Sequence, residues 1–154
     1  MQQAYPKDVS VHVRHFPLPM HADAEGAARA VQAAKKQNKE WPLIDKIFEN
    51  MRALKPADLE GYASGLGVDV AKWKADFESP EIKKQVQDDV DAGKGAGVRG
   101  TPSIYVNGKR FSGQRTLEGF KPTIDEEIKK ADKLIAGGTP LDKVYEKLCK
   151  GEGG

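Results

Sequence analysis

The sequence predicts one α/β domain, α+β by content, spanning residues 1–150, with residues 151–154 as a short glycine-rich tail. Three observations support this. Apolar and polar residues alternate from Val9 to Phe16, as in a half-buried strand. Helix start signals and helical periodicity fill the stretch from Asp23 to Gly93. Asn107-Gly108 then joins two short β-like runs, which predicts a hairpin followed by more helix.

The composition excludes several classes of protein. Hydrophobic residues make up 38% of the 154 residues and charged residues 31%, which is typical of a globular domain with a core. A net charge of +2 is too small to favour a nucleic-acid partner. No apolar run reaches the roughly 18 residues that a membrane-spanning helix needs, so we expect no membrane partner. The opening residues, Met1 to Pro6, lack the basic start and apolar core of a signal peptide.

Cysteine and histidine content restricts the chemistry further. Cys149 is the single cysteine, so the chain can form neither an internal disulfide nor a Cys-x-x-Cys redox pair. His12 and His15 are an odd number of residues apart, and on a strand they would point to opposite faces. A site made from these residues and His21 is conceivable, but we expect no metal site and no cofactor.

The predicted strand comes first. Val9, Val11 and Val13 would form its buried face, and Pro17 would end it.

The first predicted helices follow. Asp23 is the expected N-cap of a helix that ends near Lys36. A second helix runs from Trp41 to Met51 with a predicted buried face of Leu43, Ile44, Ile47, Phe48 and Met51. Pro56 opens a third helix, which ends at the glycines from Gly65 to Gly67.

Two further helices complete this block. Asp69 is the expected N-cap of a helix with Val70, Trp73 and Phe77 on its apolar side. Pro80 starts the next helix, which is expected to fray from Gly93 to Gly97 and to bury Ile82, Val86 and Val90.

The hairpin and the C-terminal helices come last. Ser103 to Val106 and Lys109 to Ser112 are the expected strands. Thr116 is the expected N-cap of a helix to Ile135, in which Pro122 predicts a kink or a late start. Its sheet-facing residues would be Leu117, Phe120, Ile124, Ile128 and Ile135. A final helix would carry Leu141, Val144, Tyr145 and Leu148.

Three stretches carry a family resemblance. The run from Gly97 to Gly113, the ending from Arg14 to Pro19, and the tail from Thr139 to Tyr145 together resemble the DsbA-like branch of thioredoxin-fold thiol-disulfide oxidoreductases. The resemblance implies a helical insertion over about 22–96, a cis-proline hairpin over about 97–113 and C-terminal helices over about 116–149.

The resemblance also implies a function. DsbA-like proteins exchange disulfides in extracytoplasmic proteins, so it implies a periplasmic or other extracytoplasmic location and an extended polypeptide as partner. Gly100, Thr101 and Pro102 would contact the backbone of that polypeptide. The Thr101–Pro102 bond would be cis, an isomer that is common only before proline.

One feature of the family is missing. The Cys-x-x-Cys motif opens the first core helix of the family, ahead of the strand that we place at Val9 to Phe16. We therefore expect a thioredoxin-like domain that lacks its first strand and first helix. Cys149, near a helix C-terminus, lacks the positive helix end that stabilises a thiolate, so we carry over no catalytic residue.

Three functions stay open at this point. The chain could be the peptide-docking half of an oxidoreductase and inactive alone. It could instead be a non-catalytic module that binds a peptide, or a second copy as a homodimer, by strand or domain exchange at exposed strand edges. A wholly helical regulator with an incidental hairpin, and with a trans bond before Pro102, is the third.

Overall fold

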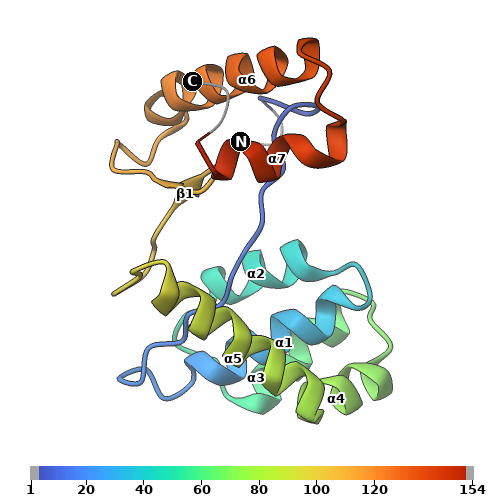
Figure 1. Ribbon diagram of the computed structural model, residues 1–154. Coiled ribbons are helices and arrows are strands. Elements are labelled where there is room, and N and C mark those ends of the chain that lie inside the picture. The colour runs from blue at the N-terminus through green and yellow to red at the C-terminus, as the bar shows by residue number, and fades with distance from the viewer. Residues whose placement is uncertain (1–3, 152–154) are drawn as a thin grey trace. The chain divides into compact units, whose positions relative to one another are not determined.

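A computed structural model describes residues 4–151, and these form two compact units (Figure 1). Residues 13–101 make up one, which we call the helical unit. Residues 4–12 and 102–151 make up the other, which we call the hairpin unit. The predicted insertion, residues 22–96, lies within the helical unit.

The helical unit is a bundle arranged around its first helix. Helix α1 packs against each of the other helices of this unit. The bounds are Ala24–Lys35 for α1, Glu40–Glu49 for α2, Pro56–Gly65 for α3, Val70–Glu78 for α4 and Pro80–Gly95 for α5. The helices predicted from the sequence are therefore confirmed, with small differences at their ends.

Local hydrogen bonds explain where several of these helices begin. The Asp69 side chain accepts from the backbone N–H of Lys72 at 3.0 Å, so the predicted N-cap of α4 is confirmed. Ser79 caps α5 in the same way, one residue before Pro80. The predicted position of Asp23 is confirmed, because it is the N-cap residue of α1. It precedes α1 but makes no side-chain cap bond, and its carboxylate instead accepts from Lys55 Nζ at 3.1 Å.

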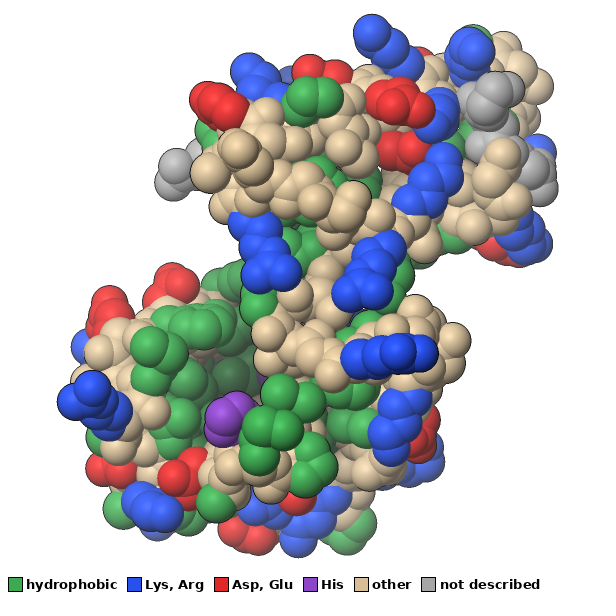
Figure 2. Space-filling view, turned by 90° about the vertical axis from the view of Figure 1, so that its left-hand side faces the viewer, with side chains coloured by type: hydrophobic (Ala, Val, Ile, Leu, Met, Phe, Trp, Pro, Cys, Tyr) green, Lys and Arg blue, Asp and Glu red, His purple; other side chains and the backbone are tan. Residues whose placement is uncertain are grey.

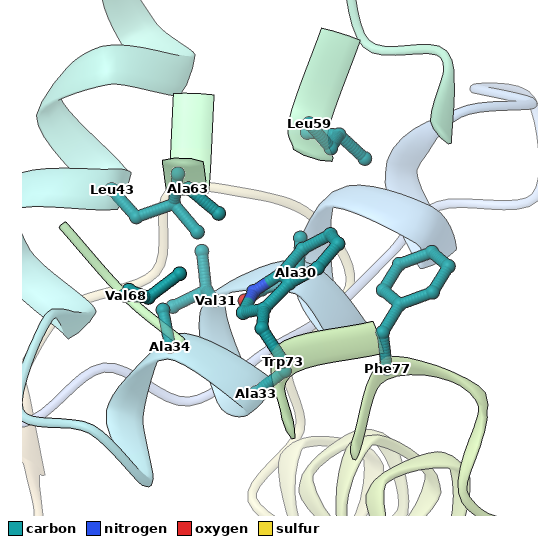
Figure 3. Packing of buried hydrophobic residues seen from close by; sticks show 10 residues of the cluster. All are labelled: Ala30, Val31, Ala33, Ala34, Leu43, Leu59, Ala63, Val68, Trp73 and Phe77. Atoms are coloured by element: carbon teal, nitrogen blue, oxygen red, sulfur yellow. The ribbon is translucent and has the colours of Figure 1, made fainter. Parts of the chain in front are cut away.

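The core of the helical unit forms where α4 crosses α1 (Figure 3). The Trp73 ring stacks on Phe77 with 5.1 Å between centroids, and its indole N–H donates to the Ala30 carbonyl at 3.1 Å. Ala30, Ala33 and Ala34 on α1 have no exposed surface, and their small side chains let the indole approach the helix backbone. The buried cluster comprises Ala30, Val31, Ala33, Ala34, Leu43, Leu59, Ala63, Val68, Trp73 and Phe77.

Part of the predicted buried face of α2 is exposed. Leu43 is fully buried, whereas Phe48 and Met51 are each 66% exposed. Phe48 lies about 140° around a helix from Leu43 at about 100° per residue, which takes it off the packed face. Met51 lies beyond the helix end, so helical periodicity does not apply to it. Hydrophobic side chains accordingly show on the helical unit, in the lower part of Figure 2.

The strand predicted from Val9 to Phe16 does not form. These residues have no regular secondary structure. In the sheet of the described residues β1 and β2 pair only with each other, so this segment has no strand partner there. A single extended segment without a ladder of hydrogen bonds is not a strand, whatever its alternation of side chains.

The end of this segment is instead fixed to α5. Arg14 Nη1 donates to Asp89 Oδ1 at 2.9 Å, and the backbone N–H of His15 donates to Asp89 Oδ2 at 3.0 Å. A Cβ on Gly93 would lie 2.8 Å from the Phe16 ring, so the ring needs a glycine beneath it. The run that we interpreted as a strand ending therefore docks against a helix.

The hairpin unit holds the sheet, β1 (Tyr105–Val106) and β2 (Lys109–Arg110), in antiparallel register with Val106 opposite Lys109. Asn107 and Gly108 have φ of 45° and 79°, as a two-residue hairpin turn requires. The hairpin is confirmed, but its strands are shorter than predicted. One further bond, from Phe111 N to the Ile104 carbonyl at 2.8 Å, extends the pairing.

Helices α6 (Leu117–Ala136) and α7 (Leu141–Cys149) complete the unit. Thr116 caps α6 by accepting from Gly119 N at 3.1 Å, as predicted. The helix runs through Pro122, so a late start is wrong. No helix of the described residues is long and apolar enough to cross a membrane.

Some hydrophobic residues of α6 that were predicted to face the sheet are exposed, and so are some hydrophobic residues of α7. Leu117 and Ile135 are each 42% exposed, Leu141 76% and Tyr145 66%, whereas Ile124, Val144 and Leu148 are buried. Helix α6 has 20 residues and is about 30 Å long, far longer than a sheet with strands of two residues can cover. The small sheet therefore leaves the ends of the helix uncovered.

Candidate functional site

The loop that contains Gly100, Thr101 and Pro102 begins where α5 ends. Gly97 has a φ of 75°, and the N–H of Val98 donates to the Gly93 carbonyl at 2.9 Å. This left-handed glycine ends the helix and redirects the chain. A glycine is needed at Gly97 because a side chain is strained at such a φ.

The three residues predicted to bind substrate follow directly. Gly100 is half-buried, and Thr101 and Pro102 are exposed. The boundary between the two compact units falls between Thr101 and Pro102. Thr101 has no hydrogen-bond partner among the described residues. The isomer of the Thr101–Pro102 bond stays a prediction.

Arg115 contributes a contact that sequence reasoning missed. Its Nη2 donates to the Pro102 carbonyl at 3.1 Å and so ties the chain after the loop to the residues before α6. Nothing in the sequence around Arg115 signals this role, because the donor and acceptor lie 13 residues apart. The Pro102 carbonyl is therefore engaged, while the backbone of Thr101 is available.

A buried carboxylate fixes the hairpin that follows Pro102. Glu127 on α6 is 5% exposed. It accepts from Asn107 Nδ2 at 3.1 Å, from Lys109 Nζ at 3.3 Å and from Lys130 Nζ at 3.0 Å. Burial raises the pKa of Glu127, but these three donors outweigh it and hold the pKa below its usual range. The carboxylate thus stays charged and pins the hairpin turn to α6.

Tyr5 makes a second link to α6. Its hydroxyl donates to Asp125 Oδ1 at 2.6 Å, and this bond is the main reason that the pKa of Tyr5 rises to about 12. Met1 to Gln3, which precede this link, lie outside the described residues.

Cys149 is a free and exposed thiol at the end of α7. It lies against the hairpin turn, where a Cβ added to Gly108 would be 3.3 Å from Cys149 Sγ. Thiol-disulfide exchange by a dithiol needs a second cysteine, which this sequence does not contain.

The described residues hold no cluster of three or more His, Cys, Asp or Glu side chains that could bind a metal ion. His15 is buried, and His12 and His21 are exposed. The structure therefore offers exposed backbone at Thr101 and a fixed hairpin after it, which suits binding of an extended chain.

Residues 1–125 match the family of DSBA-like thioredoxin domains, and the chain belongs to that family. The match covers the helical unit and the hairpin, so the resemblance inferred from the motifs is confirmed. No solved structure matches the chain.

Curated relatives fall into two groups by name. The chain is 30% identical over 135 residues to a probable disulfide bond formation protein D of Bacillus cereus, covering 79% of this chain and 59% of that protein. It is 39% identical over 106 residues to a Na(+)/H(+) antiporter NhaA of Herminiimonas arsenicoxydans, covering 69% of this chain and 17% of the antiporter. An NhaA 3 antiporter of Salinispora tropica is 32% identical over 130 residues, which is 20% of its length.

The chain thus spans a fifth or less of these two antiporters and 59% of the disulfide bond formation protein. The antiporter-named proteins match only in their DsbA-like region.

Proposed function

We propose that this chain supplies the polypeptide-docking part of a DsbA-like thiol-disulfide oxidoreductase and has no redox activity by itself. Membership of the family supports the reaction class. The observation that carries the docking role is the exposed, unbonded backbone of Thr101, directly before Pro102. Its N–H and carbonyl can pair with the main chain of an extended substrate, as in β-strand addition.

The single cysteine is the reason for expecting inactivity. Exchange begins when a thiolate attacks one sulfur of a disulfide and forms a mixed disulfide, which a second thiol then resolves. Cys149 alone can form the mixed disulfide but has no partner to resolve it. The dithiol must therefore come from outside these residues. We also propose an extracytoplasmic location, the setting in which disulfides persist.

An exchange assay tests the redox part. We expect the chain to produce no turnover of a fluorescent disulfide substrate, with or without Cys149→Ser. Turnover that disappears in Cys149→Ser would contradict the proposal, because it would make Cys149 a working nucleophile.

A matched pair of variants tests the docking part. Thr101→Ala keeps the backbone N–H, whereas Thr101→Pro removes it. Titration with a capped unstructured peptide, followed by amide NMR shifts of residues 100–104, should show binding to the native chain and to Thr101→Ala. Binding should weaken by ~10-fold in Thr101→Pro, which corresponds to the loss of one or two hydrogen bonds. Equal binding by both variants would contradict the docking role.

The small sheet favours a second candidate, a non-catalytic module that assembles through strand edges. The sheet of the described residues has two strands of two residues each, so each strand has one edge without a strand neighbour. Light scattering after gel filtration separates the cases. A dimer, twice the 16.8 kDa chain, that persists in reductant favours assembly by strand or domain exchange. A dimer that reductant dissociates indicates a Cys149–Cys149 bridge, and a monomer counts against assembly.

A further inference from the structure

The C-terminal end of α5 has an incomplete helix cap. The N–H of Val98 donates to the Gly93 carbonyl at 2.9 Å, and the N–H of Gly97 donates to the Lys94 carbonyl at 3.0 Å. With Gly97 at a φ of 75°, these two bonds form the Schellman arrangement that ends many helices. An apolar contact often accompanies it, between the residue after the left-handed glycine and a residue of the last helical turn. Here these residues are Val98 and Gly93, and Gly93 has no side chain to make the contact.

The ring of Phe16, from the segment before α1, occupies the position of the missing side chain. A Cβ built on Gly93 would lie 2.8 Å from one ring carbon of Phe16 and 3.0 Å from a second. The same Cβ would lie 3.7 Å from Val98 Cβ, so the ring and Val98 border one small volume above Gly93. Val98 is half-buried, whereas residues 94–97 and Arg99 are exposed. The ring is thus placed to supply the contact that Gly93 cannot make.

Hydrogen bonds to a buried carboxylate hold Phe16 in this place. Asp89 is 4% exposed and lies one helical turn before Gly93, on the same face of α5. It accepts from the backbone N–H of His15 at 3.0 Å and from Arg14 Nη1 at 2.9 Å. The residue directly before the ring is therefore fixed to the helix through its backbone. Because losing these donors would leave a buried carboxylate unsatisfied, the bonds set the register of the segment on α5.

We infer that Phe16 is a positioning residue for the loop that contains Gly100 and Thr101, and that it acts through the cap at Gly93 and Val98. Packing Val98 against the ring fixes the direction in which the chain leaves α5, and so restricts the backbone that follows. A peptide that pairs with Thr101 then has less of the loop to order when it binds. The inference rests on the proposed function, because docking at Thr101 gives the positioning its consequence.

Peptide affinity tests the inference, with the same capped peptide and NMR titration. Phe16→Ala should weaken binding by ~10-fold, since the peptide itself must then order the loop. Phe16→Leu keeps a large apolar side chain and should restore most of the affinity. The matched control is Phe48→Ala, because Phe48 belongs to the same unit but is 66% exposed at α2. This control should bind the peptide like the native chain.

Two glycine substitutions on α5 test the mechanism. Gly93→Ala places a methyl group 2.8 Å from the Phe16 ring, so the ring must move and binding should weaken. In the Phe16→Ala background the space is empty, and the same methyl group, 3.7 Å from Val98 Cβ, should restore part of the affinity. This reversal of sign is the coupling expected of residues in direct contact. Gly95→Ala is the matched control, because a Cβ there meets no atom within 4 Å, and it should change binding in neither background.

Equal peptide binding by Phe16→Ala and the native chain would overturn the inference, and so would additive effects of Phe16→Ala and Gly93→Ala. If Phe16→Ala does not fold, Gly93→Ala compared with Gly95→Ala decides, and equal binding by these two counts against the inference. Hydrogen exchange at the Val98 N–H separates the two proposals. Protection that falls in Phe16→Ala, while the native chain binds no peptide, would contradict the proposed function alone. Unchanged protection at Val98 would overturn the inference.

Discussion

The helical unit and the hairpin unit achieve burial to different degrees. In the helical unit the large side chains of Trp73, Leu43, Leu59 and Ile82 are 0–1% exposed. The hairpin unit has fewer buried hydrophobic residues among those described, and each keeps some exposed surface: 4% for Leu148, 5% for Ile124 and 8% for Val144.

The difference follows from how each kind of element satisfies its backbone. A helix closes its hydrogen bonds within itself, so four helices can pack around α1 without a continuous sheet. A strand needs a neighbour, and a sheet with two residues in each strand provides little surface for α6 and α7. The hairpin unit relies more on polar contacts at Glu127 and on the Phe111–Phe120 ring stack at 4.2 Å.

The largest expected effect concerns Trp73. Trp73→Ala removes the buried ring and leaves a cavity between α1 and α4, so we expect a loss of about 3–5 kcal/mol in the free energy of unfolding of the helical unit. Urea unfolding followed by circular dichroism measures it. Trp41→Ala is the control, since this side chain is 37% exposed and should cost much less. Equal losses in the two variants would show that the core does not lie where α1 meets α4.

The second prediction concerns the polar contacts of the hairpin unit. Glu127→Ala leaves Lys109 and Lys130 without their shared carboxylate, so we expect a loss of about 1–3 kcal/mol in the stability of this unit. Hydrogen exchange at the amides of the hairpin measures it. Glu126→Ala is the matched control, because Glu126 is exposed and solvent screens its pair with Lys130, so this change should cost clearly less.

Acid should weaken the same contacts. Because the pKa of Glu127 is lower in the folded chain than in the unfolded one, the unfolded state binds more protons. The stabilisation is present above the usual pKa of a glutamate and is lost as the pH falls through the folded value. Glu127→Gln should flatten this dependence between pH 6 and about pH 3. An unchanged slope would argue that Glu127 does not anchor the hairpin.

The last prediction concerns His15 in the helical unit, where we expect the smallest effect. Burial lowers the pKa of His15, against the opposing attraction of Asp89 and Glu40, and its Nε2 has no partner in the described residues. Folding therefore favours the neutral ring, and stability is lost as the pH falls below the usual histidine pKa of about 6.5.

Unfolding experiments between pH 7.5 and pH 5, a window around the usual histidine pKa of about 6.5, test this prediction. The free energy of unfolding should decrease toward acid in the native chain and less so in His15→Gln. His21→Gln is the control, because His21 is exposed. A decrease that persists in His15→Gln but vanishes in His21→Gln would refute the assignment.

Local signals in the sequence located much of the fold. The N-caps at Asp69 and Thr116 and the turn at Asn107-Gly108 depend on residues within three positions, so they are readable from sequence. Predictions that needed a distant partner were less accurate. The strand at Val9 to Phe16 was inferred from alternation alone, and alternation does not show whether a neighbouring strand is present.

The candidate docking site shows the same division. The sequence placed Gly100, Thr101 and Pro102 in a loop between a helix end and a hairpin, and the structure agrees on that placement. The sequence could not reveal that Arg115 donates a hydrogen bond to the Pro102 carbonyl. The Asp89 contacts with Arg14 and His15 were equally hidden, since they join residues about 75 positions apart.

The sequence by itself determined the helices, the hairpin turn, the family and the absence of a second cysteine, because each depends on neighbouring residues or on composition. Only the tertiary structure decided which apolar faces are covered, which carboxylates are buried and which buried polar atoms lack a partner. These properties depend on what lies opposite each side chain after folding. Glu126 and Glu127 are adjacent glutamates in the sequence, and only their surroundings distinguish an exposed carboxylate from a buried one that holds the hairpin.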